Sequence, residues 1–244
     1  MNTKRKSQFN ALFMAIVIFA CVFSSCKGND PSLNLATKPE AVAANDASSA
    51  GVYKGIIVGS SGYFSLSIKN GTDAVTCKFV FDGNEVTLSS ASFSSWTSGQ
   101  SINSALFTGT LNGQTINLTF SCDANGANPT TTVTIPGHTV YTTVIKETST
   151  ALVRCYEGTY TVAKKSGTIN GTWNFVAYKL STGNGSLVAG YHADPESNGE
   201  IYGDEVDGVL QIGSSPLKMT DTTVSGSFNN GSGELVTVTG KRTY

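Results

Sequence analysis

A chain of 244 residues with a formal net charge of −1 and only 14% charged residues lacks the concentrated positive charge that binding to a nucleic-acid backbone requires. Glycine is abundant, with 26 residues, and serine, threonine and asparagine are frequent, a composition typical of short strands joined by tight turns. The length suffices for one large β domain or two small ones, each able to bury a core without a metal or a disulfide. We therefore expect an all-β protein that does not bind nucleic acid.

The first 25 residues have the layout of a bacterial signal peptide. Lys4, Arg5 and Lys6 supply a positive start, and a continuous apolar run over residues 11–23 follows them. At about 13 residues this run is too short for a membrane-spanning helix, which needs roughly 20. We therefore expect this leader to be cleaved rather than kept as a transmembrane anchor.

The leader ends in Phe23-Ser24-Ser25-Cys26, which resembles the lipobox cut by lipoprotein signal peptidase, with Phe23 in the place where leucine is preferred. We expect Cys26 to become the lipidated N-terminus. Acyl chains contribute about 0.8 kcal/mol per buried methylene, and several chains together hold a protein at a membrane. The alternative is a secreted protein cleaved nearby with an unmodified Cys26.

Residues 26–50 are predicted to form a flexible tether. They are mostly small or polar, contain Pro31 and Pro39, and show no apolar periodicity. Pro39-Glu40-Ala41 is compatible with one short helical turn. A flexible segment of this length has an end-to-end distance of roughly 25 to 30 Å, which would lift a folded domain clear of the lipid headgroups.

Beyond residue 50 the main signal is the alternation of apolar and polar residues. Ile116, Leu118, Phe120 and Cys122 fall on one face of their segment, with threonine, asparagine and serine on the other, the pattern of a half-buried antiparallel strand. The same alternation recurs in residues 64–68, 75–81 and 187–191. Tight turns are predicted at Asn70-Gly71, Asp82-Gly83, Asn112-Gly113, Asn125-Gly126, Asn184-Gly185 and Asn230-Gly231. The predicted fold class is all-β, as antiparallel sandwich or up-and-down barrel modules.

A weak internal repeat predicts two such modules in tandem, residues 51–150 and 151–244. Tyr53-Lys54-Gly55 in the first half is matched by Tyr156-Glu157-Gly158 in the second. Each half is long enough for roughly five to eight strands. Chance similarity in a chain rich in glycine, serine and threonine is the alternative to a duplication.

Three cysteines follow Cys26, namely Cys77, Cys122 and Cys155. Cys77 and Cys122 lie on apolar strand faces, so a disulfide can form between them if their strands are neighbours, and the cell envelope permits one. The odd number leaves at least one free thiol, and buried free thiols throughout are an equal alternative. No Cys-x-x-Cys or cysteine-histidine spacing indicates a zinc site.

Six of the 17 carboxylates cluster between residues 194 and 207. As a loop, this stretch would offer five candidate calcium ligands: Asp194, Glu196, Glu200, Asp204 and Asp207. The spacing does not match an EF-hand, so a solvated acidic hairpin without a cofactor is favoured, with calcium as the alternative.

Motifs for catalysis are scarce. The chain has only two histidines, His138 and His192, both expected to be exposed, and contains no Gly-x-Ser-x-Gly or His-Glu-x-x-His motif. Two carboxylates of the acidic stretch would allow glycoside hydrolysis only if they faced each other across a cleft, which spacing alone does not indicate. A non-enzymatic protein is therefore favoured.

Aromatic side chains supply the candidate ligand contacts Trp96, Tyr191 and Tyr202, because flat rings stack on sugars and line the mouths of barrels. Trp96 lies among serine and threonine residues and is expected at the surface. Trp173 and Phe175 share one strand face and are expected in a core.

A further likeness rests on the lipobox followed by Lys27 and on residues 50–55, 59–62, 156–160, 171–175 and 240–243. Together these segments resemble uncharacterised envelope lipoproteins of the Bacteroidota. The resemblance implies an outer-membrane address and a β fold, and it supplies no catalytic or binding residues. Asp30 is the only acidic residue shortly after Cys26, so display on the cell surface is not indicated.

Three functions are compatible with these features. The first is a non-enzymatic lipoprotein anchored to the outer membrane that contacts a glycan or an envelope protein; a filled core and an exposed Trp96 would favour it. The second is a calycin-like barrel that holds a small apolar ligand; a closed barrel with an unfilled, aromatic-lined interior would favour it. The third is a glycan hydrolase that uses the acidic stretch.

Overall fold

The computed structural model describes residues 35–179, 184–193, 197–206, 209–212 and 215–244, and the all-β prediction is confirmed. Apart from one 3-10 turn at Ala43–Asn45, the regular structure of these residues consists of strands in antiparallel sheets. No helix in the described part of the chain is long and apolar enough to cross a membrane.

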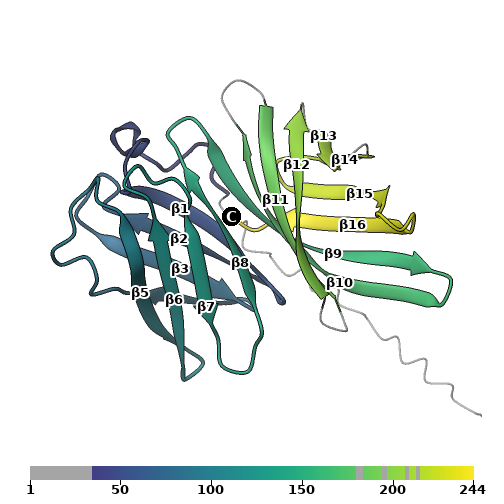
Figure 1. Cartoon of the computed structure of the whole chain (residues 1–244), viewed down its shortest axis with the longest axis horizontal. Helices are drawn as coiled ribbons and strands as arrows, with labels where there is room; N and C mark the ends of the chain where they lie inside the picture. Colours follow the sequence, from purple (N-terminus) through teal and green to yellow (C-terminus); the bar gives the residue numbers. More distant parts are fainter. Residues whose placement is uncertain (1–34, 180–183, 194–196, 207–208, 213–214) are drawn as a thin grey trace, which may run out of the picture. The chain divides into compact units, whose positions relative to one another are not determined.

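The first eight strands form two sheets that pack as a sandwich, called module 1 below (Figure 1). One sheet has the order β4-β3-β2-β1-β8 and the other the order β5-β6-β7. Tyr53, Phe64, Phe107 and Phe120 are fully buried in the core between them, and each such side chain contributes about 1.5–3 kcal/mol. The bounds are β1 (Gly51–Val58), β2 (Gly62–Ile68), β3 (Val75–Phe81), β4 (Asn84–Leu88), β5 (Ile102–Leu111), β6 (Gln114–Cys122), β7 (Thr130–Thr134) and β8 (Tyr141–Glu147).

Hydrogen bonds connect the two sheets at both of their open sides. Ser89 and Thr108 exchange backbone hydrogen bonds of 2.9 and 2.8 Å where β4 ends beside β5. The hydroxyl of Thr142 in β8 donates to the carbonyl of Thr131 in β7 at 2.9 Å. The strands of module 1 therefore follow one another around the core in chain order, and the last returns beside the first.

The last eight strands, module 2, form an up-and-down barrel in which the strand pairing closes on itself (Figure 1). Each strand pairs with the next, and β16 pairs with β9. At this closure Gly158 faces Gly240, and a Cβ on Gly158 would lie 2.2 Å from the carbonyl oxygen of Thr239, so only glycine fits there. The bounds are β9 (Leu152–Lys164), β10 (Gly167–Lys179), β11 (Asn184–Ala193), β12 (Ser197–Val206), β13 (Val209–Ile212), β14 (Ser215–Met219), β15 (Thr223–Asn229) and β16 (Leu235–Arg242).

Both modules use the same order of eight consecutive strands, and the internal repeat of the sequence falls on the first strand of each. Tyr53 lies in β1 and Tyr156 in β9, and both are 0% exposed. Each hydroxyl donates to a backbone carbonyl at 2.9 Å, that of Ser49 and that of Thr220. Both tyrosines are therefore buried with a bonded hydroxyl, although the acceptor of Tyr53 lies four residues away and that of Tyr156 lies between β14 and β15.

The two modules share a buried apolar seam. Residues 33–244 form one compact unit, so the modules are not separate bodies joined by a linker. The seam consists of Ile56, Val58 and Tyr63 from module 1 and Val153, Cys155 and Val176 from module 2.

Asn174 joins the modules, because β10 contacts module 1 with one face and the barrel interior with the other. Its Nδ2 donates to the carbonyls of Ile57 and Ser60 in module 1, at 2.7 and 2.8 Å. Successive side chains of a strand point to opposite faces. Trp173 and Phe175, on either side of Asn174, therefore face the barrel interior, where both are buried.

The predicted tether is wrong for residues 35–50, which pack against module 1. The Glu147 carboxylate accepts hydrogen bonds from the backbone N–H groups of Glu40 and Ala41, at 2.6 and 3.3 Å. Ala50 is only 1% exposed. The segment is held by hydrogen bonds from its backbone to a side chain of module 1. Because this contact does not require an apolar face, the sequence of the segment shows no apolar periodicity.

All three cysteines of the described chain, Cys77, Cys122 and Cys155, are buried and free. Cys77 lies in β3 and Cys122 in β6, which belong to different sheets of module 1, so the condition for a disulfide between neighbouring strands is not met. Of the two alternatives left open by the sequence, the structure shows buried free thiols.

Candidate functional site

The interior of the β9–β16 barrel carries a ladder of aromatic rings. Tyr156 of β9 and Phe175 of β10 stack with their ring centroids 4.6 Å apart and their planes 6° apart. Trp173 lies 4.8 Å from Phe175 at an angle of 35°. The three side chains are at most 1% exposed. They present flat apolar faces inside the barrel.

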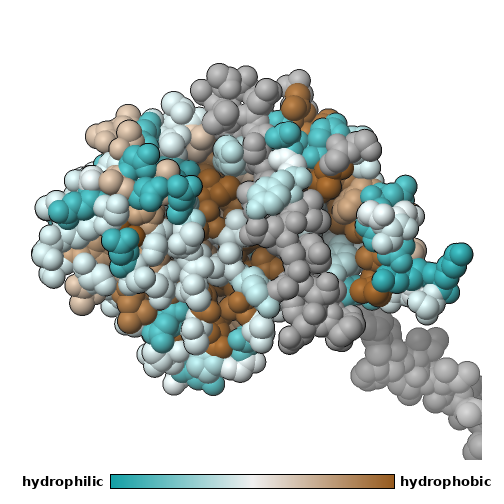
Figure 2. All heavy atoms as spheres, in the orientation of Figure 1, coloured by the Kyte–Doolittle hydropathy of each residue, from teal (hydrophilic) through white to brown (hydrophobic). Residues whose placement is uncertain are grey.

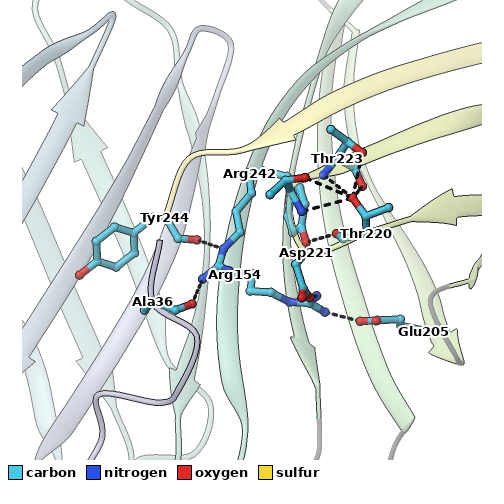
Figure 3. A network of polar contacts seen from close by, with 10 residues as sticks. Ala36, Arg154, Glu205, Thr220, Asp221, Thr223, Arg242 and Tyr244 are labelled. Atoms are coloured by element: carbon cyan, nitrogen blue, oxygen red, sulfur yellow. Dashed lines mark hydrogen bonds and ion pairs between the residues drawn. The ribbon is translucent and has the colours of Figure 1, made fainter. Parts of the chain in front are cut away.

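A buried ion pair lies beside this ladder (Figure 3). Arg154 Nη2 donates to Glu205 Oε2, and both side chains are 3% exposed. Arg154 belongs to β9 and Glu205 to β12, which are not neighbours in the barrel, so their contact crosses the interior. Arg154 Nη1 also lies 3.3 Å from Asp221 Oδ1, whose side chain is 90% exposed. The guanidinium therefore reaches from the interior to the rim.

The turn between β14 and β15 holds Asp221 at this rim (Figure 3). Thr220 Oγ1 accepts the backbone N–H groups of Thr222 and Thr223, at 3.2 and 2.9 Å. The Tyr156 hydroxyl donates to the Thr220 carbonyl at 2.9 Å. Burial raises the pKa of Tyr156 to about 12, so this hydroxyl stays neutral and continues to donate at physiological pH.

Arg242 connects the same end of the barrel to the N-terminal segment (Figure 3). Its Nε donates to the backbone carbonyl of Tyr244 at 2.9 Å, and its Nη2 donates to that of Ala36 at 2.6 Å. Burial lowers the pKa of Arg242 from its ordinary value, but a guanidinium remains charged in proteins.

Two buried donors of the barrel interior have no protein acceptor. Trp173 Nε1 and Arg154 Nε make no hydrogen bond within the described part of the chain. Leaving a buried donor unpaired costs about 1–3 kcal/mol, and roughly 90% or more of buried backbone groups in folded proteins are paired, as are most buried side-chain polar atoms. Thr172 Oγ1 is also unpaired, on the outer face of β10. The interior thus offers hydrogen-bond donors beside flat rings.

The loop that the calcium alternative required does not form, because residues 197–206 are strand β12, which pairs with β11 as a hairpin; within it Glu205 is buried rather than solvated. Asp204 is exposed on this strand, and the side chain of Glu200 lies outside the described residues, as do Asp194, Glu196 and Asp207 altogether. Among the residues that the structure describes, no group of three or more histidine, cysteine, aspartate or glutamate side chains is placed to hold a metal ion.

The expectation of an exposed Trp96 is wrong. Its side chain is 8% exposed and packs on Phe93, with ring centroids 5.4 Å apart, and Nε1 donates to the Gln100 carbonyl at 3.3 Å. Trp96 lies in the segment between β4 and β5, and its ring packs into the core of module 1. Tyr202 is 66% exposed, and Tyr191 pairs in register with Trp173, with its side chain outside the described residues.

Of the two histidines, His138 lies in module 1, outside the barrel, and only the backbone of His192 is described. His138 is exposed in module 1, where its ring lies 4.8 Å from that of Phe81. His192 pairs through its backbone with Asn198 in the β11–β12 hairpin, and its side chain is outside the described residues.

Sequence reasoning missed Arg154 and Glu205 as partners. Arg154 interrupts an otherwise apolar strand start, Leu152-Val153-Arg154-Cys155-Tyr156, and a charge in such a run signals a buried partner elsewhere. Glu205 was grouped with exposed carboxylates because its place in β12 was not apparent.

Comparison of the chain with protein-family models, with curated proteins and with solved structures finds no match.

Proposed function

We propose that the protein is a lipid-anchored, non-enzymatic binding protein of the bacterial outer membrane that takes a small ligand inside the barrel of module 2. The observation that carries the proposal is Trp173 Nε1, a buried donor with no acceptor among the described residues, inside a closed barrel with aromatic side chains. Binding sites for small molecules combine apolar walls with a few polar groups that fix orientation. Eight-stranded barrels either fill their interior with side chains or hold one small ligand. The described side chains inside this barrel pack together in one core, so among the described residues the unpaired donors are what supports a ligand.

A ligand inside the barrel is favoured over contacts at an exposed aromatic surface. Trp96, the ring that would have served a glycan or protein partner, is buried. On the face shown in Figure 2, hydrophobic side chains appear as separate patches among hydrophilic ones rather than as one continuous docking surface. Such scattered apolar side chains are normal on soluble proteins.

Ligand binding is tested with diphenylhexatriene, a hydrocarbon dye that fluoresces in apolar surroundings. The full chain carrying Cys26→Ala needs no detergent if the anchor is lost, and we expect it to bind the dye saturably at one site. Tyr202→Ala is the control, because that ring is 66% exposed and its removal should leave binding unchanged. Loss of saturable binding in Tyr202→Ala would contradict a site inside the barrel, and so would the absence of saturable binding both of this dye and of Nile red, an uncharged planar dye that carries acceptors.

The anchor is tested separately by metabolic labelling with a fatty acid. We expect the native chain to be labelled and membrane-bound, and Cys26→Ala to lose both the label and the membrane association. Cys77→Ala, which removes a buried thiol, should keep both. Label that persists in Cys26→Ala would rule out lipidation at this residue.

A further inference from the structure

Among the described residues, the two buried donors of the barrel interior that lack a partner have the same hydrogen-bonding character. The indole nitrogen of Trp173 only donates, and so does Nε of Arg154. Another donor cannot satisfy either group. A ligand that removes the cost of burying them must therefore carry acceptor atoms such as carbonyl or ether oxygens.

The charges at this end of the barrel already balance. Arg154 pairs with Glu205 and with Asp221, and Arg242 interacts electrostatically with Asp221. Among the described residues, both ion pairs of Arg154 are therefore made with carboxylates of this chain, Glu205 and Asp221. A charged ligand would lose its hydration without gaining an uncompensated counter-charge, which is costly in an apolar interior.

The ladder geometry selects for shape. Tyr156 and Phe175 are almost parallel, at 6°, and Trp173 is tilted by only 35° from Phe175. Aromatic faces bind other flat rings in offset stacks with centroids about 4.5–7 Å apart. Because these rings already cover one another where they stack, a ligand can stack only on the faces that their mutual contacts leave, and a planar ligand fits such a face better than a branched one.

We infer that the barrel of module 2 takes an uncharged, planar ligand whose acceptor oxygen receives the Trp173 Nε1 hydrogen bond. This inference rests on the proposed function and adds the chemical class of the ligand. Trp173 orients the ligand, the ladder stacks on it, and the Arg154–Glu205 pair closes the polar end of the interior without attracting ions.

Two dyes separate the class of ligand from binding itself. Nile red is uncharged and planar and carries acceptors but no donors, whereas diphenylhexatriene has neither. In Trp173→Phe, which keeps an aromatic ring, we expect the affinity for Nile red relative to diphenylhexatriene to fall about 3- to 10-fold, the value of one neutral hydrogen bond. The ratio cancels the loss of ring area, which affects both dyes.

Thr172→Val is the matched control, because Thr172 Oγ1 is equally unpaired but lies on the outer face of β10. This variant should leave the ratio unchanged. An anionic dye, anilinonaphthalene sulfonate, should bind the native chain more weakly than Nile red. If both neutral dyes bind and Trp173→Phe lowers their affinities equally, the inferred ligand class is wrong, whereas the proposed binding function is not contradicted. Tighter binding of the anionic dye also overturns the class. If neither neutral dye binds, the proposed function fails together with the inference.

Discussion

At the scale of single residues, a buried carboxylate fastens the N-terminal segment to module 1. Glu147 is 0% exposed and accepts from Lys54 Nζ at 2.7 Å and from the Glu40 N–H at 2.6 Å. We expect Glu147→Gln to lower the free energy of unfolding by at most about 3–5 kcal/mol, because Lys54 loses its buried counter-charge and keeps only the partly exposed Glu40 carboxylate, 3.3 Å away. Glu85→Gln removes an exposed pair with Lys78 and should cost less than about 1 kcal/mol. Urea unfolding compares the two variants, and equal losses would refute the assignment.

At the scale of elements, strands that bury one face could be predicted and the partners across the barrel could not. Alternation marks β6, and the shared face of Trp173 and Phe175 correctly indicates a core. Arg154 and Glu205 are 51 residues apart in the sequence. Each side chain can be buried only because the other, on a different strand, neutralises its charge. For the same reason, the packing of residues 35–50 could not be predicted, because their partner Glu147 is distant in the sequence. Tertiary contacts of this kind leave no local pattern.

At the scale of the whole molecule, the contact between Arg242 and Ala36 shortens the chain available between the body and the proposed anchor. Ala36 follows Cys26 by ten residues, and an extended chain spans at most about 3.3–3.6 Å per residue, or roughly 35 Å in total. The proposed lipid anchor would therefore keep the polar end of the barrel within roughly 35 Å of Cys26.

The indole N–H signals of the full chain carrying Cys26→Ala measure the central claim most directly. The chain has two tryptophans; Trp96 Nε1 is already bonded to the Gln100 carbonyl, and Trp173 Nε1 has no protein acceptor within the described residues. Trp96→Phe assigns the two signals in a nitrogen–proton correlation spectrum. At saturation with Nile red, the Trp173 signal should move and the Trp96 signal should stay in place. A stationary Trp173 signal under saturating dye would contradict a ligand bound inside the barrel.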